Sequence, residues 1–183
     1  MKRIILAVVG VLSVSVSADA QSTAEMIERA LAPAPTRTRD AVTVIKWNAD
    51  YTYEILREGT NQMVCYDRSD VPGRMAFGAQ CTVLGNLERA AQNRRINILG
   101  LRQAERNYLV AAEEENGTRA KVVYGSVWIS ADGQDQASAR IHMTIAVPNA
   151  TEATSGFSED PRSGGVWIMD AGTDGAHLMI PGH

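Results

Sequence analysis

The first twenty residues constrain this chain most, because they indicate which part folds and in which redox environment. Lys2 and Arg3 precede an apolar run over residues 4–12, and a serine-rich stretch leads to a small-x-small site ending at Ala20. This order is typical of a secretory signal peptide. A bilayer span needs about 20 apolar residues, more than this run supplies. We therefore expect cleavage between Ala20 and Gln21 and a soluble periplasmic or extracellular product, with no membrane insertion after cleavage.

Cys65 and Cys81 are the only two cysteines in the sequence. In an oxidising compartment, a pair at this spacing favours a structural disulfide, and closing such a loop stabilises a fold by roughly 3 kcal/mol in the chain-entropy model. The Cys-x-x-Cys spacing of redox-active pairs is missing. Free thiols, or a metal or redox role, are the alternatives.

Charge and composition limit the partners of the exported chain. Cleavage before Gln21 would change the formal net charge from −3 to −4. A mildly acidic chain has no long-range attraction for nucleic acid or for an anionic membrane, so we expect neither as a partner. The remaining length, roughly 160 residues, suits a single domain with a modest core.

Hydrophobic periodicity predicts an α+β domain over residues 41–183, preceded by a helix and linker over 21–40 that either packs on the domain or only tethers it. Antiparallel strands are expected at both ends of the domain, with a helical middle and one disulfide. The expected strands are 41–47, 51–58, 62–66, 75–83, 124–130 and 140–147, with short apolar segments at 166–169 and 178–180. The expected helices are 22–32, 84–95 and 98–115.

The same periodicity predicts which side chains are buried. In the helix over 84–95 we expect Arg89 to point outward, and in the helix over 98–115 we expect Leu101 and Tyr108 to point inward. In the strand over 140–147, Ile141 belongs to the apolar face and His142 to the opposite face.

The stretch LREGTNQMVC over residues 56–65 resembles an uncharacterised family of small exported bacterial proteins. Its members carry LREGTNGWTC, a loop, a second cysteine, a helical middle and a C-terminal PHxM segment. The counterparts here are Cys81 and residues 176–179, where Ala176 replaces the proline. The resemblance implies export and pairing of Cys65 with Cys81. It implies no activity.

Residues Arg57, Glu58 and Asn61 of this stretch are candidate functional residues, because they lie in a loop beside the disulfide. Together with His177 they could form the pocket of an enzyme of unfamiliar type. The alternative is a structural turn, in which Gly59 adopts a positive φ and Asn61 caps the next strand.

His177 and Met179 are weak candidates for metal ligands. Two residues apart on a strand they share a face, and imidazole with thioether suits copper. The sequence contains no dense ligand cluster of metal-site spacing, so no cofactor is expected.

Motifs of known hydrolases do not occur, since Gly-x-Ser-x-Gly and His-Glu-x-x-His are both missing. Our leading hypothesis is therefore a soluble exported, non-enzymatic binding or envelope-associated module of unknown ligand. An enzyme working near Arg57, Glu58, Asn61 and His177 is the first alternative, and a periplasmic metal-handling protein using His177 and Met179 is the second.

Overall fold

The computed structural model describes residues 22–180, so the expected signal peptide and its cleavage site between Ala20 and Gln21 lie outside the described residues. The helices are α1 (Thr23–Ala30), α2 (Leu87–Asn97), α3 (Gln103–Glu115) and α4 (Glu152–Ser155), with short 3-10 turns at Arg39–Ala41 and Leu84–Asn86. The strands are β1 (Thr43–Trp47), β2 (Tyr53–Arg57), β3 (Met63–Asp67), β4 (Phe77–Val83), β5 (Val127–Gly133), β6 (Arg140–Ala146), β7 (Trp167–Met169) and β8 (His177–Met179).

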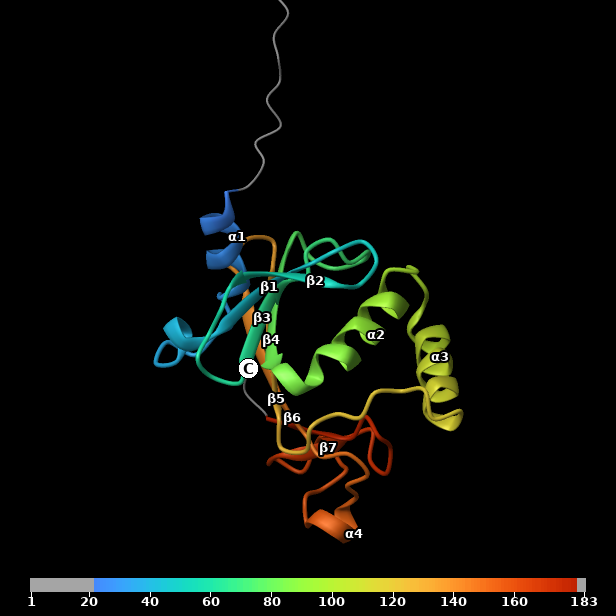
Figure 1. Ribbon diagram of the computed structural model, residues 1–183. Coiled ribbons are helices and arrows are strands. Elements are labelled where there is room, and N and C mark those ends of the chain that lie inside the picture. Colours follow the sequence, from blue (N-terminus) through green and yellow to red (C-terminus); the bar gives the residue numbers. More distant parts are fainter. Residues whose placement is uncertain (1–21, 181–183) are drawn as a thin grey trace, which may run out of the picture.

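All eight strands form one sheet in the order β2-β1-β3-β4-β5-β6-β8-β7. In Figure 1 the strands run from β1 and β2 in the upper part of the picture to β7 in the lower part. Neighbouring strands are antiparallel except β1 and β3, which run parallel. The parallel pair arises because the chain returns from β2 to the start of β1, where the backbone N–H groups of Thr60 and Asn61 both donate to the carbonyl of Ala41. The next strand must therefore leave in the direction of β1.

The predicted α+β class and the disulfide agree with the structure, but the finer arrangement does not. Ala30, Leu31 and Ala34, expected to precede the domain, are buried in its core, so the domain begins with α1 rather than with a strand, and the strands from both parts of the sequence join in one mixed sheet. The short helix α4 lies between the expected strands 140–147 and 166–169, where no helix was expected. These differences depend on pairing between distant segments, which periodicity does not specify.

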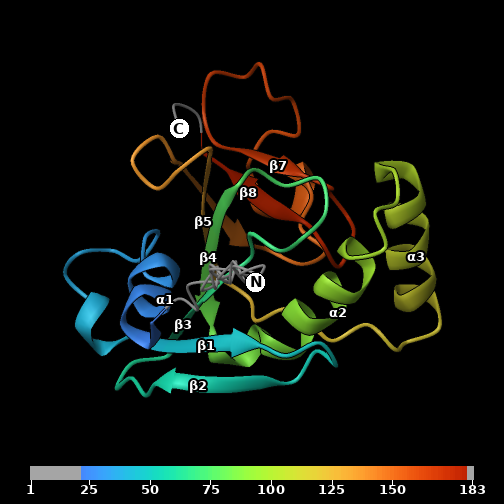
Figure 2. The same cartoon turned by 90° about the horizontal axis from the view of Figure 1, so that it is seen from above.

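One face of the sheet is apolar and is covered by α1 (Figure 2). Leu31, directly after α1, is buried in one cluster with Val44, Cys65, Cys81 and Ile129. The disulfide joins Cys65 to Cys81, which are direct cross-strand partners on β3 and β4. The segment around α1 is therefore part of the core and not merely a tether.

The other face of the sheet carries α2, and α3 lies beyond it (Figure 2). Over β1 and β3 this face is apolar, where Ile45, Trp47 and Val64 pack with Leu87 and Ala90 of α2. By contrast, α3 buries none of its residues.

The expectation that Leu101 and Tyr108 point into the core is therefore wrong. Leu101 is only partly buried, and Tyr108 is 74% exposed. The physical reason is that α2 already occupies the sheet, so α3 has no apolar surface left to cover.

The C-terminal strands form a smaller apolar cluster of Val147, Ile168, Ala176 and Leu178. The turn between β7 and β8 is held to α2 by an ion pair between Arg89 and Asp174, with both side chains less than 10% exposed. Arg89 was expected to point outward, which is wrong. Among residues 22–180, no helix has the length and apolar composition needed to cross a membrane.

Candidate functional site

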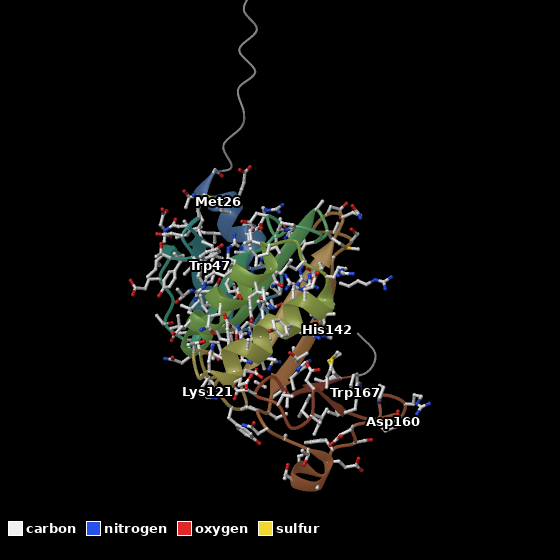
Figure 3. The ribbon with its side chains drawn as sticks, turned by 90° about the vertical axis from the view of Figure 1, so that its right-hand side faces the viewer. Met26, Trp47, Lys121, His142, Asp160 and Trp167 are labelled. Carbon is white, nitrogen blue, oxygen red and sulfur yellow. A yellow bond between two sulfur atoms is a disulfide. The ribbon has the colours of Figure 1, made fainter. Side chains whose placement is uncertain are left out.

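A polar cleft of about 550 Å³ lies on the face of the sheet that carries α2 and α3. Its floor comes from alternate residues of β5 and β6, which the register places side by side: Trp128 lies opposite Thr144, and Ser130 lies opposite His142. Figure 3 looks onto this face, with Trp47 toward one edge of the sheet and His142 beyond the helices toward the other. A sheet face under helices is normally apolar. The polar floor is therefore the unusual feature of this fold.

Side-chain amides that line the cleft have N–H groups without a protein acceptor in the described residues. Arg119 donates to Asn93 Oδ1, and arginine can only donate, which fixes the orientation of the Asn93 amide. By the same logic Arg106 donates to Gln103 Oε1, so Gln103 Nε2 donates to Asn107 Oδ1 at 2.6 Å. The amide oxygens of Asn93 and Asn107 are thus both occupied by protein donors. Neither amide nitrogen has a protein partner among residues 22–180.

A third amide repeats this pattern on the floor. The hydroxyl of Tyr66 lies 3.0 Å from Gln80 Oε1, and Gln80 Nε2 has no acceptor in the described chain. Burial raises the pKa of the Tyr66 hydroxyl well above its usual value, so this group stays protonated and can donate. Gln80 therefore offers its amide N–H groups to the cleft.

Arginines line the same cleft, and most of them are paired with acids. Arg68 pairs with Asp132, and Arg119 pairs with Glu113. The side chain of Arg74, in the loop between β3 and β4, makes no hydrogen bond or ion pair with any residue of the 22–180 segment, and only the backbone N–H of Arg74 is bonded, to the carbonyl of Val71. Partial desolvation, and next the positive charge of Arg68, lower the pKa of Arg74. Arg74 is thus an exposed guanidinium available to a ligand.

The Arg68–Asp132 pair is incompletely satisfied. Arg68 Nε and Asp132 Oδ1 are both buried and have no hydrogen-bond partner in the described residues. Buried polar atoms without partners cost stability, and in native proteins they are rare enough that each requires a structural or functional reason. Both residues line the cleft beside Ser130.

Two histidines lie at the end of the cleft farthest from β1. His142 on β6 is exposed, and His177 on β8 is half-buried, with Nδ1 2.8 Å from the carbonyl oxygen of Gly175. Of the residues proposed from sequence, His177 is the one that lines this cleft.

Arg57 and Asn61 have structural contacts at the opposite edge of the sheet. The Arg57 guanidinium donates to the carbonyls of Arg39 at 2.6 Å and Val42 at 3.1 Å. Asn61 Oδ1 accepts from the backbone N–H of Met63 at 2.8 Å, as expected for a cap of the following strand. Both side chains therefore anchor the backbone around β1.

Gly59 does not have the positive φ expected for this turn. It is required instead for close approach, since a Cβ there would overlap the backbone of Ala41, Val42 and Thr43. Its N–H donates to Thr43 Oγ1 at 3.1 Å. The motif thus holds the connection between β2 and β3 tightly against the start of β1.

The structure does not bring Arg57, Glu58 and Asn61 together with His177. β2 and β8 are six strand positions apart, which at about 4.8 Å per strand is roughly 29 Å. Glu58 is exposed and has no side-chain partner within the described part of the chain. The pocket on which the enzyme hypothesis depended is not formed by these four residues.

His177 and Met179 lie on the same face of β8, as the sequence predicted. Among residues 22–180, no group of three or more histidine, cysteine, aspartate or glutamate side chains is arranged to hold a metal ion.

The cleft was missed at the sequence level, although one signal was present. The polar residues of β5 and of β6 recur at every second position, and a hairpin between them aligns both sets. In the strand over 140–147, the alternation predicts an apolar face and an opposite face that includes His142. It contains no information on the helices and the loop over 68–76 that enclose the polar side.

Comparisons with models of protein families, with curated proteins and with solved structures found no match to this chain. The resemblance carried by residues 56–65 therefore stays a prediction, and the geometry alone supports a function.

Proposed function

We propose that this protein is an exported, non-enzymatic binding module that takes a small polar ligand in the cleft between the sheet and α2 and α3. The observation that carries the proposal is the polar floor. Gln80, Ser130 and His142 are consecutive cross-strand neighbours on the face that would ordinarily be packed with apolar side chains. Binding sites are concave and place a few polar groups to fix the orientation of a ligand.

The proposal also includes maturation outside the cytoplasm, in the periplasm or the extracellular space, after removal of residues 1–20. Its support is the disulfide between two fully buried cysteines, because disulfides persist in oxidising compartments. A mature protein whose mass begins at Gln21 and includes the crosslink is expected. A full-length, reduced protein in the cytosol would refute this part.

Filling the cleft tests the binding role. Ser130 is 7% exposed at the floor, so Ser130→Phe projects an aromatic ring into the cleft. Ser163→Phe places the same ring on an exposed loop and is the matched control. The wild type and both variants are purified from their own compartment, checked for folding by circular dichroism, and examined by native mass spectrometry.

A small-molecule mass retained by the wild type and by Ser163→Phe, but lost from folded Ser130→Phe, is expected. As a second measurement, the low-molecular-weight fraction of the same compartment is added to each purified protein. It should raise the melting temperature of the wild type and of Ser163→Phe, but not that of Ser130→Phe. The proposal fails if the wild type carries no ligand and this fraction shifts none of the three proteins.

A further inference from the structure

The hydrogen-bonding groups of the cleft indicate the class of its ligand. We infer that the ligand carries an oxyanion (a phosphate, sulfate or carboxylate group) bound by Arg74 with the side-chain amides of Asn93 and Asn107. This inference rests on the proposed function and adds the chemistry of the recognised group.

The first argument is that these three residues share one place. Arg74, Asn93 and Asn107 line both the main cleft and an adjoining cavity of about 200 Å³ between α2 and α3. They come from the loop after β3, from α2 and from α3, respectively. Elements distant in sequence therefore converge on one region.

The second argument is the excess of donors over acceptors. Because Arg119 and Gln103 occupy the amide oxygens of Asn93 and Asn107, both amides present N–H groups. Arg74 adds up to five N–H donors in a planar fork. A group with several oxygen acceptors and no hydrogens matches this set, whereas a donor-rich ligand does not.

The third argument is charge. Arg106 lines the same adjoining cavity, and its guanidinium donates to Leu101 O at 2.8 Å and to Gln103 Oε1, not to an acid. Arg74 and Arg106 are thus two cations without an acidic partner in the described chain. Partial desolvation and the positive charges of Arg68 and Arg106 lower the pKa of Arg74, the negative charge of Asp132 offsets part of this effect, and a bound anion would act in the same direction as Asp132.

Acids that line the cleft offset the positive charge around Arg74 only in part, through Asp132. Asp132 is committed to Arg68, and Asp174 is committed to Arg89 and Lys121. Asp170 follows β7, at the end of the cleft near His177. Asp132 and Asp174 are therefore each paired with a cation, and Asp170 lies at the end of the cleft away from Arg74.

The probes are inorganic phosphate, sulfate and acetate, with glycerol as the neutral comparator, each added at constant ionic strength to the mature disulfide-bonded protein. Binding is followed by ¹⁵N NMR at the Arg74 Nε–H and at the side-chain amides of Asn93 and Asn107. The three anions distinguish tetrahedral from planar oxyanions by their relative affinities. The variants are Arg74→Gln, Arg74→Lys and the control Arg162→Gln, which removes an exposed guanidinium paired with Asp160.

At least one anion is expected to shift these three signals with saturation at millimolar concentration, while glycerol does not. Hydrogen bonds to charged groups contribute enough that Arg74→Gln should weaken binding about tenfold or more. Arg74→Lys should retain part of the affinity because it keeps the charge but loses the planar fork. Arg162→Gln should bind like the wild type.

The inference is overturned if no anion shifts these signals up to tens of millimolar, or if Arg74→Gln binds as tightly as the wild type. In that case the cleft-filling experiment on Ser130 decides separately whether the binding role survives with a neutral or cationic ligand.

Discussion

The buried ion pair between Arg89 and Asp174 should be a principal support of the C-terminal strands. Arg89 Nη1 lies 3.2 Å from Asp174 Oδ2, and the two side chains are 7% and 9% exposed. Arg89 also donates to the carbonyl of Ala120 at 2.8 Å and lies 3.6 Å from Glu114 Oε1. The pair thus connects α2 to the turn that precedes β8.

Replacing Asp174 with alanine leaves the guanidinium of Arg89 buried without its nearest carboxylate. Removing one partner of a buried pair costs about 3–5 kcal/mol. The remaining contacts of Arg89 with Ala120 and Glu114 place the expected loss at the lower end, about 3 kcal/mol. For a domain of this size, each kcal/mol lowers the melting temperature by about 2–4 °C, which gives a decrease of about 6–12 °C.

Urea unfolding, followed by circular dichroism, measures this loss, provided that the denaturant dependence of the unfolding free energy stays unchanged. The matched control is Asp160→Ala, which removes an exposed carboxylate paired with Arg162 and should leave the stability nearly unchanged. A double-mutant cycle with Arg89→Met should show coupling, because the second substitution removes the stranded charge. The reasoning is refuted if Asp174→Ala is as mild as Asp160→Ala.

Three further predictions concern the disulfide, the close backbone approach at Gly59 and one local hydrogen bond. Replacing Cys65 and Cys81 together by alanine should lower the free energy of unfolding by roughly 3 kcal/mol, measured by urea titration against the oxidised wild type. Gly59→Ala should cost about 1–3 kcal/mol by forcing the backbone apart, whereas an alanine at Gly165, where a Cβ meets no atom within 4 Å, should be nearly neutral; equal stabilities would contradict the close approach. The Ser138 hydroxyl, and next its backbone N–H, hold the pKa of Asp135 below its usual range, so this contribution to stability is present above the ordinary aspartate pKa and is lost as the pH falls through the lowered value. In an NMR titration, Ser138→Ala should raise the pKa of Asp135, and an unchanged midpoint would show that the hydroxyl has no such role.

Local patterns in the sequence were sufficient to predict most elements. Ser22 and Glu25 form the capping box that begins α1, and a hydroxyl followed three residues later by a carboxylate can be recognised from the chain itself. Strands β1 to β6 lie within two or three residues of the predicted ranges, because alternation and β-branched composition are local properties. The cysteine pairing also followed from the sequence, because two cysteines allow one pairing.

The candidate site could not be predicted in the same way. Arg89 has the sequence context of a solvent-exposed helix residue, and it is buried because Asp174, 85 residues later, folds against it. Tyr108 has the spacing of a core residue and is exposed because α2 already covers the sheet beneath α3. In both cases the deciding partner is distant in sequence.

By itself, therefore, the sequence determined the types of element, their approximate ranges and the single crosslink, since each depends on neighbouring residues or on the number of cysteines. Only the tertiary structure decided that β1 and β3 are parallel, that the motif over residues 57–61 anchors a hairpin, and that the polar faces of β5 and β6 form the floor of a cleft. The physical reason is that alternation specifies two faces of a strand, whereas the elements that cover each face determine whether its polar side meets solvent or encloses a binding site.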